Sequence, residues 1–307
     1  MKRNKNLIFN ICNQCNVKCR HCSNAETLND GRKAEPSYIL KWLEDASEAD
    51  FSEATFVGGE PFLYVDDLIL YCKKTHELGM KSCIITNGFW ATTFERAVEL
   101  LKSIKGLDSI LVSSDLFHME YIDSEIIKNV FNACIQLNIN IAMNATCSSK
   151  EDKKKIWDIY SEYKNSVFIN THMLMPIGAA KSLPVERWCL EDKITKLPVV
   201  CGIDNFLVDM DGDVHACCNS ILSKEPLFYV GNMKKESLSL LLKNFIRNPL
   251  YCVMKEQGPR GLGKFLVNSP YYQEFSQQEY TCECDFCISV LESNKLRKYI
   301  ISKILTT

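Results

Sequence analysis

Three cysteines near the N-terminus, Cys15, Cys19 and Cys22, are spaced C-x3-C-x2-C. Thiolates this close together on one loop suit a compact iron–sulfur cluster. Three ligands for a four-iron cluster leave one iron open to a substrate or cofactor, which distinguishes a catalytic cluster from one that only transfers electrons. The spacing therefore predicts metal-centred chemistry near the start of the chain.

Other uses of these cysteines fit the spacing less well. A structural zinc site normally takes two cysteine pairs separated by a longer loop, but the pairs Cys12/Cys15 and Cys19/Cys22 are only three residues apart. A bacterial ferredoxin run has a different spacing and ends in proline, whereas Ser23 follows here. Disulfides are not expected, because the first residues do not resemble a secretory signal.

Composition narrows the class of protein further. The 307 residues include 16 cysteines, and 36 Lys and Arg balance 38 Asp and Glu. Balanced charge gives no reason to expect a nucleic-acid partner, and no apolar stretch approaches the roughly 20 residues of a membrane span. Abundant cysteine without a signal peptide predicts a cytoplasmic protein with metal-bound thiolates and no membrane partner.

Short β-type runs alternate with amphipathic helical patterns over the first part of the chain, which predicts a parallel sheet with helices outside. Six such units favour an α/β fold, a partial (β/α)6 barrel of the TIM type, whose site lies at the C-terminal rim. The expected strands are Leu7–Ile11, Glu53–Val57, Ser82–Thr86, Ser109–Ser113, Ile139–Asn144 and Val167–Thr171. The expected helices are Ser37–Ala49, Asp66–Gly79, Thr93–Ser103, Asp123–Leu137 and Lys150–Tyr163.

The pattern changes after Pro176. Asp211-Gly212 is a hairpin signal between Phe206–Met210 and Asp213–Cys217. A helix at Glu236–Ile246, an irregular Gly- and Tyr-containing stretch and a final helix from Ile288 are expected to follow. We therefore divide the chain into a barrel, residues 1–180, and a small C-terminal domain, residues 181–307.

A second motif, Gly58-Gly59-Glu60-Pro61, follows the second expected strand. Together with the cysteine run it resembles the radical SAM superfamily over roughly the first 180 residues. The resemblance implies that the three N-terminal cysteines hold a [4Fe–4S] cluster whose open iron binds S-adenosylmethionine (SAM). The glycines would let the backbone approach the methionine amine, and Glu60 would accept a hydrogen bond from it.

Polar residues at the ends of later strands, Asn87, Ser113 and Asn144, are expected to line the SAM pocket. Capping of the following helices is the alternative use of these side chains.

A second cysteine set lies in the C-terminal part. Cys201 and Cys217 flank Gly212 with the spacing C-x10-G-x4-C, and Cys284 and Cys287 follow later. The set resembles the short "twitch" extension of radical SAM maturases, in which four cysteines hold one auxiliary [4Fe–4S] cluster. Cys282 could replace Cys284, and a zinc ribbon is the alternative.

The resemblance extends to radical SAM peptide epimerases that lack an N-terminal peptide-recognition domain. It rests on the runs Thr86–Trp90, Ser114-Asp115-x2-His118, Ile177–Lys181, Asp211-Gly212-x4-Cys217-Cys218 and Gly231–Met233. In such enzymes a cysteine that matches Cys218 returns a hydrogen atom to the substrate; as an alternative, Cys218 is a small buried side chain. The family pattern has Asp where this chain has Asn205, with Asp204 beside it, so both are candidate catalytic residues.

The resemblance implies an enzyme with two [4Fe–4S] clusters and SAM that epimerises L-residues to D in a ribosomally made peptide. Its partners would be a precursor peptide and a small electron donor such as a flavodoxin or ferredoxin. The alternatives are a maturase that forms thioether or carbon–carbon crosslinks and a small-molecule dehydrogenase. His21 is interpreted as a packing residue, whereas His118 either contacts substrate or is a structural histidine.

Overall fold

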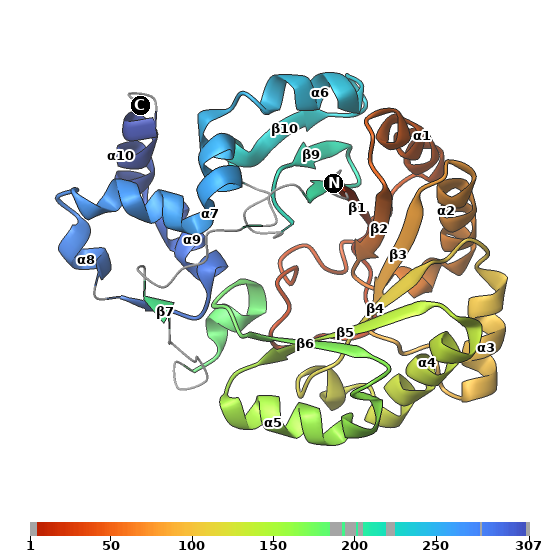
Figure 1. The fold of residues 1–307 in the computed structure, drawn as a ribbon. Coiled ribbons are helices and arrows are strands. Elements are labelled where there is room, and N and C mark those ends of the chain that lie inside the picture. The colour runs from red at the N-terminus through yellow and green to blue at the C-terminus, as the bar shows by residue number, and fades with distance from the viewer. Residues whose placement is uncertain are drawn as a thin grey trace.

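A computed structural model describes residues 5–184, 192–193, 201, 205–218, 225–276 and 278–304. In this part of the chain, nine strands form one curved sheet in the order β10-β9-β8-β1-β2-β3-β4-β5-β6. The six strands from β1 to β6 are all parallel, and Figure 1 shows helices α1 to α5 on their outer side. This confirms the expected α/β fold of the partial-barrel type.

The barrel strands lie where the alternating pattern placed them, within three residues at each end. Their bounds are β1 (Asn6–Cys12), β2 (Glu53–Gly58), β3 (Lys81–Thr86), β4 (Ser109–Ser113), β5 (Asn140–Cys147) and β6 (Phe168–Met173). The helices between them are α1 (Pro36–Glu48), α2 (Val65–Glu77), α3 (Phe94–Ser103), α4 (Ser124–Leu137) and α5 (Lys150–Ile159). Short 3-10 helices follow β2 (Pro61–Tyr64), β4 (His118–Glu120), α5 (Ser161–Tyr163) and β6 (Gly178–Ser182).

The predicted hairpin joins the sheet of the barrel. Its strands, β8 (Phe206–Val208) and β9 (Asp213–His215), are shorter than expected, and β10 (Tyr229–Asn232) continues the sheet beyond them. β8 pairs with β1 in parallel, with Leu207 opposite Ile8. The aromatic side chain of Phe206 also contacts the ring of Tyr251, with 6.3 Å between centroids. The sheet therefore crosses the proposed domain boundary near residue 180.

The stretch expected to be irregular is helical, so that prediction was wrong. After α6 (Leu238–Phe245), helix α7 runs over Pro249–Val267 with a kink at Gly258, whose φ is 57°. Asn248 caps it by accepting hydrogen bonds from the amides of Leu250 (2.9 Å) and Tyr251 (3.3 Å). Glycine and proline here allow a kink between two buried helical segments rather than preventing a helix.

The last two helices replace the single one expected from Ile288, and a third, short helix precedes them. The elements are α8 (Tyr272–Ser276), α9 (Glu283–Glu292) and α10 (Asn294–Ile304), and β11 (Glu279–Tyr280) pairs with β7 (Asp192–Lys193). Figure 1 shows α7 to α10 on the side where the sheet, between β10 and β6, is open. One hydrophobic core joins them to the barrel. No helix among the described residues is long and apolar enough to cross a membrane.

Candidate active site

The loop that follows β1 carries the three N-terminal cysteines. The amide of Cys22 donates to the carbonyl of Cys19 (3.1 Å), and the amide of Cys15 donates to Oδ1 of Asn29 (3.2 Å), so the loop folds back on itself. All three cysteines have free thiols. Burial, with smaller contributions from neighbouring charges that include Cys19 and Cys22, raises the pKa of the Cys15 thiol to about 11.

These thiols fit an iron–sulfur cluster. Burial also raises the pKa of Cys22, so thiolates gathered in this loop require a compensating positive charge. The neighbouring Cys12 is fully buried in β1, as a core thiol would be. Iron bound to Cys15, Cys19 and Cys22 would supply this charge.

Gly58 and Gly59 lie against the start of this loop. A Cβ on Gly58 would come within 2.4 Å of the carbonyl oxygen of Cys12, and one on Gly59 within 2.2 Å of that of Gln14. The amide of Gly59 donates to the Cys12 carbonyl at 2.7 Å. The two glycines therefore let the end of β2 pack directly on the cysteine loop; their contact with SAM stays a prediction.

Glu60 is fully buried and is bound by the chain itself. Its Oε1 accepts from the amide of Phe62 (3.0 Å) and the hydroxyl of Thr86 (2.7 Å), and its Oε2 accepts from the amide of Asn87 (2.7 Å). Burial raises the pKa of Glu60 to about 7, although these hydrogen bonds act in the opposite direction. The carboxylate thus joins the loops after β2 and β3, and the hydrogen bond expected from SAM remains untested. Pro61 begins the 3-10 helix that follows.

The predicted pocket residues occupy the rim of the barrel. Asn87 is largely buried and its Nδ2 donates to Oδ1 of Asn16 in the cysteine loop (2.8 Å). Ser113 and Asn144 are paired across β4 and β5, and Asn144 accepts from Nδ2 of Asn170 on β6 (3.1 Å). Sequence reasoning missed Asn170, which continues this polar row.

A further pair on the same strands was also missed. Thr146 of β5 and His172 of β6 are partners in the sheet, and the Thr146 hydroxyl lies 2.9 Å from Nε2 of His172. Asn170 and His172, two residues apart on β6, point to one face. Polar residues at alternate positions of β5, Asn144 and Thr146, were the available signal.

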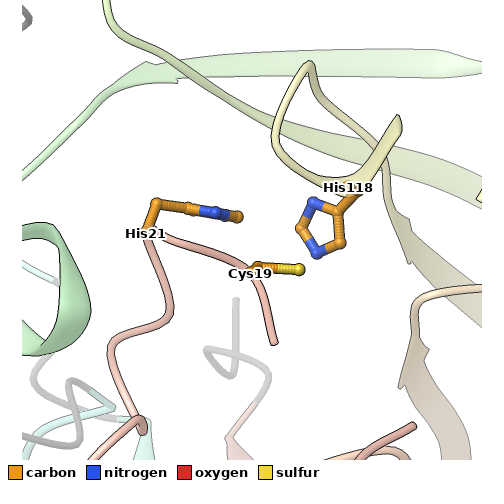
Figure 2. A group of neighbouring side chains, drawn as sticks. All are labelled: Cys19, His21 and His118. Carbon is orange, nitrogen blue, oxygen red and sulfur yellow. The ribbon is translucent and has the colours of Figure 1, made fainter. Parts of the chain in front are cut away.

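His21 and His118 do more than pack. Nδ1 of His118 lies 3.0 Å from Oδ2 of Asp115, and Nε2 of His21 lies 3.4 Å from the same oxygen. Burial opposes the charged forms of Asp115 and His118, but the ion pair between them lowers the pKa of Asp115 and raises that of His118. Figure 2 shows both rings beside the sulfur of Cys19, and the three ligand atoms all lie within 4.8 Å of one another.

The C-terminal cysteines converge from two elements. Cys217 follows β9, and Cys284 and Cys287 lie in α9. The neighbouring Cys282 raises the pKa of Cys284, as do burial and the charges of Cys287 and Cys217. Burial raises the pKa of Cys287, and the charge of Cys201 adds to this effect. These five cysteines therefore lie near enough for the charge of one to affect the pKa of another, and their binding of a cluster stays a prediction.

Two further predicted residues have different outcomes. Cys218 directly follows Cys217 and is exposed to solvent, and its role stays a prediction. Asn205 immediately precedes β8, whereas Asp204 lies outside the described residues.

Comparison with known proteins identifies the family. The "Putative peptide biosynthesis protein YydG" of Bacillus subtilis (strain 168) is 22% identical to this chain. The similarity covers 96% of this chain and 95% of that protein. An S-adenosylmethionine-dependent nucleotide dehydratase of Flammeovirga pacifica is 33% identical over 87 residues, 26% of this chain and 29% of that protein. The fold is similar to the crystal structure of BtrN in complex with AdoMet and 2-DOIA, with a TM-score of 0.50, 19% identity and coverage of 86% of this chain and 90% of that one.

The family model of the radical SAM superfamily matches residues 9–162, which is half of the chain. The match includes the cysteine loop, Gly58–Pro61 and the strands up to β5. The chain therefore belongs to the radical SAM superfamily, which implies a [4Fe–4S] cluster and SAM.

Proposed function

We propose that this radical SAM enzyme is a peptide epimerase, which converts L-residues to D in a ribosomally made peptide. The similarity to YydG, a protein named for peptide biosynthesis, extends over nearly the whole of both chains and supports a peptide substrate. Cys15, Cys19 and Cys22 hold the cluster, and Gly58–Pro61, Asn87, Ser113 and Asn144 contact SAM. When bound, the cluster and SAM together supply a 5′-deoxyadenosyl radical that removes the Cα hydrogen of the substrate residue.

The observation that carries the proposal is the course of the hairpin. β1 runs from Asn6 toward Cys12 and the cysteine loop. β8 is parallel to β1 and β9 is antiparallel to β8, with Ile8, Leu207 and His215 in one row. The chain that leaves β9 at His215 therefore runs toward the N-terminal end of β1. His215 is level with Ile8, which precedes Cys12 by four residues, or about 13 Å along the strand.

We take Cys218, three residues beyond His215, to continue on this course. A peptide between the two ends of β1 then loses hydrogen on the side of the cysteine loop and receives one from the Cys218 thiol on the other side. Removal from one face and return to the other inverts the Cα centre. The thiol of Cys218 gives up a hydrogen atom and becomes a thiyl radical, which a reductant must restore before the next turnover.

The inner side of the barrel suits an extended peptide. Asn144 with Asn170, and Thr146 with His172, place amide, hydroxyl and imidazole groups on β5 and β6. A peptide backbone carries a donor and an acceptor at each residue, and such side chains can satisfy both.

The C-terminal cysteines are proposed to hold the auxiliary [4Fe–4S] cluster. Its ligands are Cys201, Cys217, Cys284 and Cys287, with Cys282 as the alternative to Cys284. This cluster would fix Cys217, and with it the position of Cys218. A flavodoxin or ferredoxin is the proposed electron donor.

The decisive experiment uses the anaerobically reconstituted enzyme, SAM, a low-potential reductant and the peptide encoded beside its gene, in heavy water. One deuterium per modified residue, D-stereochemistry and no other mass change are expected. In Cys218→Ala, 5′-deoxyadenosine should form but D-residues should not, and the iron content should be unchanged. Cys252→Ala, which removes a cysteine of α7, is the matched control.

Three results would contradict the proposal. Unchanged D-residue formation in Cys218→Ala would remove Cys218 from the mechanism. A loss of two hydrogens from the peptide would favour a crosslinking maturase. Absence of 5′-deoxyadenosine with any peptide would argue against radical chemistry on this substrate class.

A further inference from the structure

The segment between β4 and α4, Asp115–Tyr121, holds the cysteine loop at several points. Arg20 forms an ion pair with Glu120, and the Tyr121 hydroxyl donates to the carbonyl of Lys18 at 2.8 Å. The ring of Phe117 stacks on that of His21, with 4.7 Å between centroids. We call this segment the clasp. It contacts residues on both sides of Cys19, so it fixes what lies next to that sulfur.

The clasp places one imidazole directly against Cys19. Figure 2 shows the ring of His118 with its outer nitrogen toward the Cys19 sulfur, and a ring nitrogen of His118 lies within 4.8 Å of that sulfur. The inner nitrogen, Nδ1, faces Asp115. The ring therefore lies between the Asp115 carboxylate, 3.0 Å from its Nδ1, and the Cys19 sulfur.

Asp115 is fixed more firmly than the ring it holds. It is 1% exposed. Its Oδ1 accepts from the amides of Phe117 (2.9 Å) and His118 (3.0 Å), and its Oδ2 accepts from the amide of Thr146 (3.1 Å). A carboxylate held by three backbone amides cannot turn away from the ring, so it keeps a fixed position beside His118 and orients it.

We propose that His118, positioned by Asp115, donates an N–H hydrogen bond to the Cys19 sulfur and so raises the reduction potential of the cluster. One-electron reduction by an external low-potential donor adds negative charge to the cluster and its thiolates. A hydrogen bond to a ligand sulfur stabilises that added charge, and hydrogen bonds to sulfur are among the features that set the potential of such clusters. His118 is thus a positioning residue for the cofactor and does not touch substrate.

His21 is the nearest competitor for this role. Its ring packs between Phe117 and His118, 4.9 Å from the latter, and its Nδ1 is buried without a hydrogen-bond partner. Cys19, His21 and His118 also have the spacing of a single metal ion's ligands. Cys19 belongs to the C-x3-C-x2-C run, however, so we assign the two histidines to its surroundings.

The inference rests on the family's cluster and not on the epimerase activity. The test is a redox titration, followed by electron paramagnetic resonance, of the cluster signal that changes when SAM is added. The variants are His118→Phe, which keeps a ring without a donor, His118→Gln, which keeps an N–H donor, and Asp115→Asn. The matched control is His76→Gln, which changes an exposed histidine of α2.

At the wild-type midpoint, His118→Phe should lower the ratio of reduced to oxidised cluster about tenfold, or about 59 mV for a one-electron couple. Asp115→Asn and His118→Gln should shift it less in the same direction, and His76→Gln should not shift it. An unchanged midpoint in His118→Phe with full iron content would overturn the proposal. Loss of iron from both His118 variants would also overturn it, since His118 would then be needed to hold the metal.

Discussion

The backbone amide of Asn87 donates a hydrogen bond of 2.7 Å to Oε2 of Glu60, and the carboxylate that accepts it is fully buried. This bond connects the end of β3 to the Gly-Gly-Glu-Pro turn. Asn87 in turn reaches Asn16 through its side chain. Glu60 and Asn87 together thus connect three loops at the rim, including the one that carries Cys15, Cys19 and Cys22.

The pKa of Glu60 predicts a pH dependence of stability. Burial raises this pKa from the ordinary 4.5 to about 7, so between these values the folded protein keeps a proton that the unfolded chain loses. The stabilisation is therefore full below about pH 4.5 and is lost as the pH rises through about 7. Its size is at most about 3 kcal/mol. The other titratable groups near the carboxylate are Cys12, Cys15 and His118.

The measurement is anaerobic urea unfolding of wild type and Glu60→Gln at pH 5.5 and 8. The wild type should lose more stability than the variant over this range, because Gln does not titrate. Glu77→Gln, on the exposed face of α2, should behave like the wild type. Equal pH slopes for wild type and Glu60→Gln would show that Glu60 is not the titrating group.

Gly59→Ala should impair cluster assembly. Its new Cβ would lie 2.2 Å from the carbonyl oxygen of Gln14, so the cysteine loop could not keep its position against β2. We expect a large loss of iron after reconstitution. Gly31→Ala is the control: φ there is +76° and nothing lies within 4 Å, so it should cost about 1 kcal/mol of stability but retain iron. Full iron in Gly59→Ala would contradict the proposed packing.

The iron content also tests the auxiliary site. Wild type should bind about eight irons, as two four-iron clusters, and Cys217→Ala should retain about four. Cys252→Ala should keep the wild-type value, because Cys252 lies in α7, apart from the proposed ligand set. Stoichiometric zinc in place of the second group of irons would instead support a zinc ribbon.

The sequence predicted the barrel well because local patterns determine its elements. Alternation of apolar residues located β1 to β6, and glycine and cysteine spacing located the cluster loop. The pairing of β8 with β1 could not be predicted, because Leu207 and Ile8 are far apart in the chain and only tertiary structure joins them. The same holds for His118 beside Cys19, where contacts made by the clasp decide the position.

Helix α7 is a different case, because its start signal was present in the sequence. Asn248-Pro249 is an N-cap residue followed by proline at the first helical position, a signal that the prediction of an irregular Gly- and Tyr-containing stretch did not use. Gly258 and Pro259 are both buried within the kinked helix. Their packing compensates for their low helix propensity.

This cap makes a prediction that separates local from tertiary stabilisation of α7. Asn248→Ala removes the side chain that accepts from the amides of Leu250 and Tyr251 and should destabilise the protein by about 1 kcal/mol. Asn248→Ser should restore most of that loss, because Ser caps equally well. Asn268→Ala, at the exposed C-terminal end of the same helix, should change stability little. Anaerobic urea unfolding measures all three variants; an Asn248→Ala variant as stable as wild type would mean that packing alone holds the start of α7.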